Sequence, residues 1–205
     1  MNDHDPTRLP PPAIDTTAAT AAAERFAAEA AERGDADVAY AQIDSPVGRL
    51  VAAATPAGLA MLSYEDFRGG LDAVLDTLAA RLSPRIVAAP RRLDPVKREL
   101  DEYFAGTRTT FDLALDWTLT SDFARRILQA TVQIPFGATA SYGEMAAAAG
   151  NPKASRAAGR ALGSNPIPIV VPCHRIIGTS GRLTGYTGGI DRKIKLLEVE
   201  GISLG

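Results

Sequence analysis

Residues 141–177 read SYGEMAAAAGNPKASRAAGRALGSNPIPIVVPCHRII, and their pattern predicts the architecture of the C-terminal part of the chain. Ser141 and Glu144 have the Ser-x-x-Glu spacing of a capping box, which predicts a short helix. Asn151-Pro152 predicts the cap of a second helix that runs to about Leu162. Two short helices joined by a tight turn resemble a helix-turn-helix, although many helical hairpins bind no DNA.

The same stretch places a cysteine next to a histidine. The apolar run 169–171 predicts a buried strand that ends just before Cys173. A neighbouring imidazole, here that of His174, promotes ionisation of a thiol. A carboxylate would orient the imidazole, and Glu198 and Glu200 are the candidates. Because a lone cysteine is often only a small hydrophobic core residue, this pair alone leaves both interpretations open.

The N-terminal part has a different pattern. Residues 38–43, 49–54 and 59–64 form strand-like runs separated by Pro-x-Gly turns, which predicts a three-stranded antiparallel meander. Apolar residues at helical spacing over 71–82 predict a helix, and Asp94 starts a second one. This combination of elements predicts an α+β fold.

These patterns divide the chain into four segments. Residues 1–37 form an extension, in which we expect a disordered, proline-rich tip followed by a loosely docked, Ala-rich helix. Residues 38–106 form the first domain, and residues 107–120 form a connector. Residues 121–205 form the second domain, whose first helix starts at Ser121.

Composition excludes several classes of protein. The chain has 205 residues, of which 46% are hydrophobic and 22% charged, so a wholly disordered chain is excluded. No run approaches about 18 apolar residues, which excludes a transmembrane helix. The N-terminus lacks a basic start and an apolar run, so we expect a cytoplasmic protein. With one cysteine and two histidines, we expect no metal and no cofactor.

Charge is distributed unevenly along the chain. The net charge is −2, but residues 121–205 carry ten Lys or Arg and five Asp or Glu, hence +5, and the rest carries −7. Basic residues near the helix pair, such as Lys153, Arg156 and Arg160, could neutralise phosphates. An ordinary solvated helix surface would show the same charges.

The pentapeptide Pro172-Cys173-His174-Arg175-Ile176 resembles the active-site signature of the O6-alkylguanine-DNA alkyltransferases. The resemblance continues in the family's order and spacing across about 121–201. It includes residues 141–144, 151–157, 163–169, 185–189 and 196–201. The N-terminal meander and helices also suit the family's first domain, with less specific motifs.

The resemblance implies a fold and a partner. The fold is a ribonuclease-H-like α/β domain with a three-stranded antiparallel sheet, followed by a mainly helical winged helix-turn-helix domain. The partner is double-stranded DNA that contains alkylated bases, bound from the minor groove by a monomer, with no membrane involved. Some family members carry further metal-binding cysteines, which this chain lacks.

The resemblance also assigns roles to residues. Cys173 would accept the alkyl group, His174 would deprotonate Cys173 through a water molecule, and Glu200 would orient His174. Tyr142 would donate a hydrogen bond to N3 of the base, and Asn165 would hold the segment that carries the cysteine. The residues implied to bind the base are Pro168, Ile176, Tyr186, Thr187 and Gly188.

The DNA contacts implied by the resemblance lie on the second helix of the pair. Arg156 would replace the extruded nucleotide in the base stack, because the alkylated oxygen is out of reach inside a duplex. The other residues implied to contact DNA are Lys153, Ala154, Ser155, Ala157 and Arg160.

The function that follows is direct-reversal DNA repair by a stoichiometric methyltransferase. One alkyl group would pass from O6-alkylguanine, and also from O4-alkylthymine, to Cys173. A non-catalytic DNA-binding or lesion-marking protein is one alternative, against which the presence of Cys173, His174 and Glu200 argues. A cysteine hydrolase is another, but it would need turnover through a labile thioester.

Overall fold

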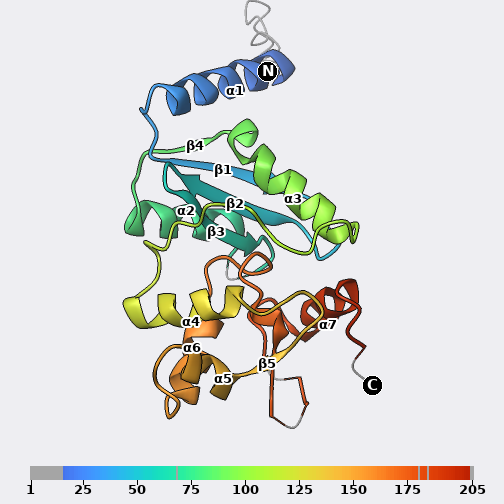
Figure 1. Cartoon of the computed structure of the whole chain (residues 1–205). Helices are drawn as coiled ribbons and strands as arrows, with labels where there is room; N and C mark the ends of the chain where they lie inside the picture. Colours follow the sequence, from blue (N-terminus) through green and yellow to red (C-terminus); the bar gives the residue numbers. More distant parts are fainter. Residues whose placement is uncertain (1–15, 68, 180, 184, 204–205) are drawn as a thin grey trace, which may run out of the picture.

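The computed structural model describes residues 16–67, 69–179, 181–183 and 185–203. A sheet domain carries the N-terminal half, and a helical domain follows it (Figure 1). A single cluster of buried side chains includes residues of both domains, so the two pack directly on each other. In the described part of the chain no helix is long and apolar enough to span a membrane.

The sheet has four strands in the order β3-β2-β1-β4. β1 (Val38–Ile43), β2 (Leu50–Thr55) and β3 (Gly58–Tyr64) are antiparallel neighbours, which confirms the predicted meander. The expectation of three strands was incomplete, because β4 (Ile86–Ala88) pairs with β1 in parallel. A strand of three residues is too short to show an alternating pattern, so periodicity does not predict it.

Helices cover both faces of this sheet. α2 (Gly70–Arg81) packs on the face of Val51 and Ala53. The opposite face carries the short 3-10 helix η1 (Pro90–Leu93) and α3 (Asp94–Phe104). Because both faces are buried, β2 is an almost continuous apolar run.

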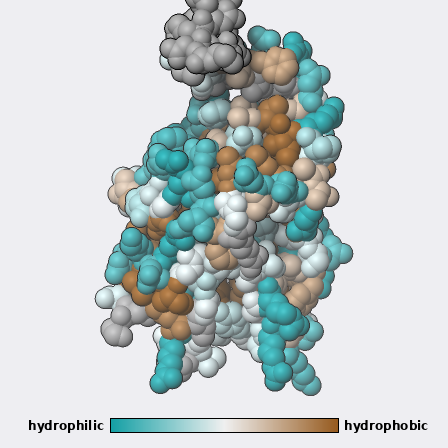
Figure 2. Space-filling view, turned by 180° about the vertical axis from the view of Figure 1, so that it is seen from behind, coloured by the Kyte–Doolittle hydropathy of each residue, from teal (hydrophilic) through white to brown (hydrophobic). Residues whose placement is uncertain are grey.

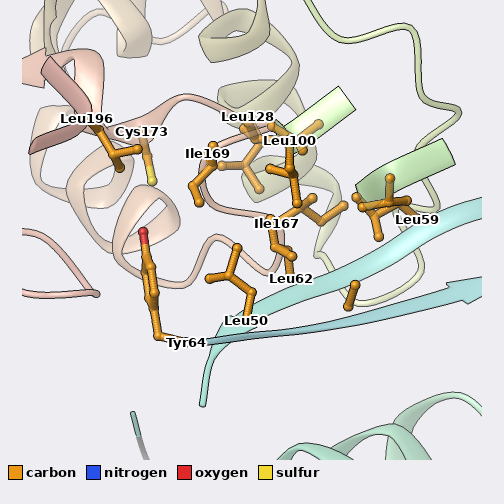
Figure 3. Packing of buried hydrophobic residues seen from close by; sticks show 14 of the residues in the cluster. Leu50, Leu59, Leu62, Tyr64, Leu100, Leu128, Ile167, Ile169, Cys173 and Leu196 are labelled. Carbon is orange, nitrogen blue, oxygen red and sulfur yellow. The ribbon is translucent and has the colours of Figure 1, made fainter. Parts of the chain in front are cut away.

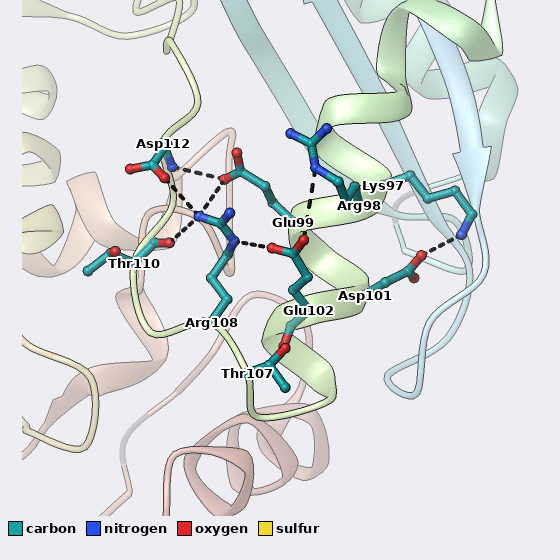
Figure 4. A network of polar contacts seen from close by, with 9 residues as sticks. All are labelled: Lys97, Arg98, Glu99, Asp101, Glu102, Thr107, Arg108, Thr110 and Asp112. Carbon is teal, nitrogen blue, oxygen red and sulfur yellow. Dashed lines mark hydrogen bonds and ion pairs between the residues drawn. The ribbon is translucent and has the colours of Figure 1, made fainter.

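The connector 107–120 runs along the edge of β3. Leu59 donates its backbone N–H to Ala114 O at 2.8 Å, and Asp116 donates to Leu59 O at 2.9 Å. Gly58 makes this approach possible, because a Cβ there would lie 2.3 Å from Ala114 O. Arg108 fixes the start of the connector to α3 through Glu102 at 2.7 Å (Figure 4).

The N-terminal extension contains the predicted helix. α1 (Thr16–Glu32) lies beside β4, at the end of the molecule away from the helical domain (Figure 1). Its single large apolar residue, Phe26, is 66% exposed, which agrees with loose docking. The expected disordered tip falls on residues 1–15, outside the described residues.

The helical domain contains α4 (Asp122–Val132), α5 (Tyr142–Ala148), α6 (Ser155–Gly163) and α7 (Ile190–Val199). The capping box is confirmed, since Ser141 and Glu144 each bond to the other's backbone N–H. The predicted start of the next helix was wrong. Residues 151–154 form a turn closed by Ala154 N to Asn151 O at 3.0 Å, and the helix begins only at Ser155.

The segment before Cys173 also differs from its prediction. Residues 169–171 are buried as expected, but they form a tight turn instead of a strand, and Ile169 has φ 74°. Asn165 stabilises this turn from within. The Asn165 side chain accepts a hydrogen bond from Ile167 N at 3.0 Å and donates one to Val171 O at 2.9 Å. It therefore satisfies backbone groups that a neighbouring strand would otherwise bond.

Hydrophobic residues on the molecular surface do not form one continuous area on the face seen in Figure 2. They gather in several separate places with hydrophilic residues between them (Figure 2). Scattered exposed apolar residues of this kind are normal for a folded domain.

Candidate active site

Cys173 opens the short 3-10 helix η2 (Cys173–Arg175), which follows the turn and leads into β6 (Ile176–Ile177). β6 pairs in parallel with β5 (Ala140–Ser141), so η2 is held from both sides. The cysteine is free and buried, and its Sγ lies 3.1 Å from Asn165 Nδ2. One asparagine therefore holds both the turn and the sulfur.

Burial disfavours the thiolate form of Cys173. It raises the pKa of the thiol to about 11, although the hydrogen bond from Asn165 and the positive charge of Lys193 both lower it. A thiol with this pKa is almost fully protonated at neutral pH. Nucleophilic chemistry at Cys173 therefore requires a base that removes the proton.

The environment of His174 suits it to act as this base. Its ring is completely buried, and Nε2 lies 2.7 Å from Glu200 Oε1. Burial lowers the pKa of His174, so the imidazole is neutral at pH 7, and an ionised carboxylate can only accept. Nε2 therefore carries the hydrogen, and Nδ1 carries the lone pair.

The lone pair on Nδ1 is unused in this structure. Of the buried side-chain nitrogen and oxygen atoms in the described residues, His174 Nδ1 alone has no hydrogen-bond partner. Buried polar atoms are normally paired, so an unpaired acceptor next to a cysteine is informative. The arrangement can accept a proton at one fixed atom.

Glu200 is the centre of a buried network. Arg175 donates to both carboxylate oxygens, at 2.8 and 2.9 Å, and Tyr103 donates its hydroxyl to Oε1 at 2.8 Å. Burial alone would raise the pKa of Glu200, but the hydrogen bonds from His174 and Arg175 outweigh it and hold the pKa at about 2. The carboxylate is thus ionised at all ordinary pH values. Tyr103 lies on α3, so the network also joins the two domains.

Lys193 adds a positive charge near the sulfur. It lies on α7 with its side chain buried, and it donates to Ile176 O. Burial lowers the pKa of Lys193 to about 8. Sequence reasoning missed this lysine, together with the buried roles of Arg175 and Tyr103. A signal existed for Lys193, because it falls on the apolar face of α7 with Leu196.

The residues expected to bind a base lie on several segments of the helical domain. Pro168 and Ile176 are buried beside Cys173 in the chain, and Thr187 Oγ1 donates to Gly163 O at 2.8 Å. Tyr142 packs its ring on α6, where a Cβ at Gly159 would lie 3.6 Å from it. Figure 3 shows the core that surrounds the cysteine.

Tyr186 and Gly188 complete this group, on the segment before α7. The Tyr186 hydroxyl lies 2.9 Å from that of Tyr64, which sequence reasoning also missed. A cleft of about 370 Å³ opens between the two domains, lined among others by Tyr64, Asn165 and Thr187. Cys173 does not line this cleft, but it contacts Asn165, which does.

The predicted DNA-contacting residues lie apart from this buried centre. Arg156 and Arg160 project from α6 as exposed side chains, and Lys153 is exposed in the preceding turn. None of these three has an ion-pair partner among the residues that the structure describes. Ala154 caps α6, and Ser155 and Ala157 follow in its first turn, so small side chains surround Arg156.

Family models match nearly all of the two domains. The 6-O-methylguanine DNA methyltransferase, ribonuclease-like domain, matches residues 38–117. The 6-O-methylguanine DNA methyltransferase, DNA binding domain, matches residues 122–202. The expected fold class, a ribonuclease-like domain before a helical DNA-binding domain, is confirmed.

Individual proteins agree with these models. The methylated-DNA–protein-cysteine methyltransferase of Mycolicibacterium paratuberculosis is 44% identical over 168 residues, which cover 80% of this chain and 92% of the relative. The constitutive methyltransferase of that name from Bacillus subtilis is 40% identical over 167 residues, 80% of this chain and 96% of the relative.

Solved structures agree as well. The Mycobacterium tuberculosis OGT in complex with DNA has 43% sequence identity and a TM-score of 0.68, and the match covers 79% of this chain and 92% of that one. The O6-methylguanine methyltransferase of the same organism matches with 43% identity and a TM-score of 0.68, over 80% and 92% of the two chains.

The network around Glu200 predicts a large effect of removing its charge. Glu200→Gln should lower the free energy of unfolding by about 3–5 kcal/mol, because it leaves the buried Arg175 guanidinium uncompensated. Urea denaturation measures this loss. Glu198→Gln, at an exposed position two residues earlier, should change stability by less than about 0.5 kcal/mol. Equal effects of the two substitutions would contradict the network's importance.

Proposed function

This chain belongs to the 6-O-methylguanine DNA methyltransferase family, and from that premise we propose that it repairs DNA by transferring the methyl group of O6-methylguanine to Cys173. It is a methylated-DNA–protein-cysteine methyltransferase, as its relatives are named. One observation carries the assignment to Cys173. The buried thiol lies next to a histidine whose tautomer Glu200 fixes and whose Nδ1 is unpaired.

The first step is removal of the proton from Cys173. The thiol proton passes to His174 Nδ1 through a bridging water, and Glu200 stabilises the imidazolium that results. The positive charge of Lys193 favours the thiolate at the same moment. Because His174 and Cys173 are both neutral at rest, the charge separation occurs only transiently.

The second step is transfer of the alkyl group. The thiolate attacks the methyl carbon in line with the bond to O6, so a carbon–sulfur bond forms as the carbon–oxygen bond breaks. The electron pair of the broken carbon–oxygen bond stays on O6 of the guanine. The hydrogen bond from Tyr142 to N3 stabilises the departing base. The product is a thioether without a leaving group, so each protein molecule acts once.

The flipped base is held by the segments on either side of η2. Pro168 and Tyr186 form walls of the pocket, and the backbone N–H of Thr187, next to Gly188, faces the alkylated oxygen. The carbonyls of Cys173 and Ile176 accept hydrogen bonds from the exocyclic amine. Ile176 O already accepts from Lys193, and its second lone pair remains for the base.

Double-stranded DNA is bound by α6. The minor groove is only about 6 Å wide, so it must widen to admit a helix, and small side chains at Ala154, Ser155 and Ala157 ease that entry. Lys153 and Arg160 contact phosphates, and Arg156 fills the gap left by the flipped nucleotide. The protein binds DNA as a monomer. Besides O6-alkylguanine, O4-alkylthymine in duplex DNA is a further substrate of the transfer to Cys173.

The direct test is the stoichiometry of transfer. With a duplex oligonucleotide that carries one O6-methylguanine, intact-protein mass should rise by one methyl group per protein molecule, located on Cys173. Cys173→Ser should abolish transfer and retain DNA binding. Binding without any mass change would contradict alkyl transfer, and release of product over many turnovers would indicate a hydrolase.

The dependence of the rate on pH tests the role of His174. Between the lowered pKa of His174 and the pKa of about 11 of Cys173, the fraction of thiolate–imidazolium pair does not depend on pH. We therefore expect the single-turnover rate not to rise from pH 7 to 9. It should fall by less than about threefold as Lys193 loses its proton near pH 8, because the positive charge of Lys193 favours the thiolate.

A variant without the imidazole should behave differently. In His174→Gln only hydroxide removes the thiol proton, so the rate should rise about tenfold per pH unit over the same range. Glutamine keeps an N–H for Glu200, and circular dichroism checks that the fold is retained. A wild-type rate that climbs in the same way would rule out His174 as the base.

Removal of the Arg156 side chain tests nucleotide flipping. Arg156→Ala should slow transfer from duplex DNA by about tenfold or more, because nothing then fills the gap in the base stack. Transfer from the free base O6-benzylguanine needs no flipping and should change by less than about twofold. Arg91→Ala, at an exposed position on η1, is the matched control. If both substrates slowed equally, Arg156 would act in some other way.

A further inference from the structure

Tyr64 reaches from the sheet domain into the active site. It is the last residue of β3 and is only 2% exposed. Figure 3 shows its hydroxyl pointing toward the sulfur of Cys173. Burial raises the pKa of both Tyr64 and Tyr186, and the charge of an ionised Cys173 raises both further, which agrees with this proximity.

The Tyr64 ring is fixed on the side of the active-site segment. Its hydroxyl lies 2.9 Å from the hydroxyl of Tyr186, and the two rings meet edge to face with centroids 6.4 Å apart. Gly188 fits against both rings, since a Cβ there would lie 2.3 Å from Tyr64 Cε2 and 2.9 Å from Tyr186 Cε1. Tyr64 and Tyr186 therefore pack directly against each other, with Gly188 beside both.

A second contact fixes the ring through Arg192. The guanidinium carbon lies 4.4 Å from the centroid of the Tyr64 ring. Arg192 is itself held, because it donates to Val47 O at 2.7 Å and to Gly188 O at 3.0 Å and pairs with Asp66 at 2.7 Å. Contacts on several sides leave the ring little freedom to move aside.

The Tyr64 ring borders both the sulfur and the cleft between the domains. Tyr64 faces the sulfur with its hydroxyl, and it lines the cleft of about 370 Å³ between the domains. In an in-line displacement only one carbon of the alkyl group lies between sulfur and oxygen, so the remainder of a larger group projects sideways. A rigid ring at this place limits the room for that remainder.

We propose that Tyr64 limits the size of the alkyl group that Cys173 accepts, by holding Tyr186 in place and closing the passage from the sulfur to the cleft between the domains. This inference rests on the proposed alkyl transfer to Cys173. It makes Tyr64 a specificity-determining residue, contributed by the domain that does not carry the nucleophile.

The test compares a small and a large alkyl group in the same duplex. Rate constants for transfer from O6-methylguanine and O6-benzylguanine are measured by intact-protein mass for the wild type, Tyr64→Phe and Tyr64→Leu. Leucine removes the ring and opens the passage, so the benzyl-to-methyl ratio should rise about tenfold. Phenylalanine removes only the bond to Tyr186, so the ratio should rise about fourfold.

Controls separate specificity from stability. A merely structural role would lower both rate constants together and leave their ratio unchanged. Tyr40→Phe and Tyr40→Leu make the same changes on β1, beside the other core cluster, and should not move the ratio. If Tyr64→Leu does not fold, the benzyl-to-methyl ratio of the nearly isosteric Tyr64→Phe still tests the size limit.

The outcomes distinguish this inference from the function on which it rests. An unchanged ratio in folded Tyr64 variants that still transfer methyl groups would overturn the size limit alone. A wild-type protein that transfers no methyl group to Cys173 would overturn the proposed function and the size limit with it.

Discussion

The buried carboxylate of Glu200 is the interaction on which the rest of the site depends. A buried charge is costly unless it is paired, and Glu200 is paired by Arg175 and His174 and bonded by Tyr103. The same contacts fix the tautomer of His174 and connect the helical domain to α3. Stability and the proposed chemistry therefore both depend on this one group.

The sheet domain is more than a support for the helical domain. Tyr103 on α3 reaches the carboxylate from one side, and Tyr64 on β3 reaches the space in front of the sulfur from another. The connector between the two domains is fixed along β3 through Leu59. The domain that does not carry Cys173 thus contributes one side chain to the Glu200 network and one to the contact with Tyr186.

Asn165 shows how local structure serves the site. Its side chain bonds to Ile167 and Val171 and also contacts the sulfur, so the turn and the nucleophile are placed together. This explains why the apolar run before Cys173 is a turn where the sequence predicts a strand. Apolar character reports burial, but the left-handed conformation of Ile169 depends on a side-chain contact that periodicity does not show.

Features that depend on near neighbours in the chain can be predicted from the amino-acid sequence. The three antiparallel strands and the capping box of Ser141 and Glu144 belong to this group, and the motif around Cys173 showed the family. The contact of Tyr103 with Glu200, 97 residues further on, and that of Tyr64 with Tyr186, 122 residues further on, are visible only in the folded protein. Such contacts form only when distant segments pack together, because no local pattern in the sequence specifies which distant residues will meet.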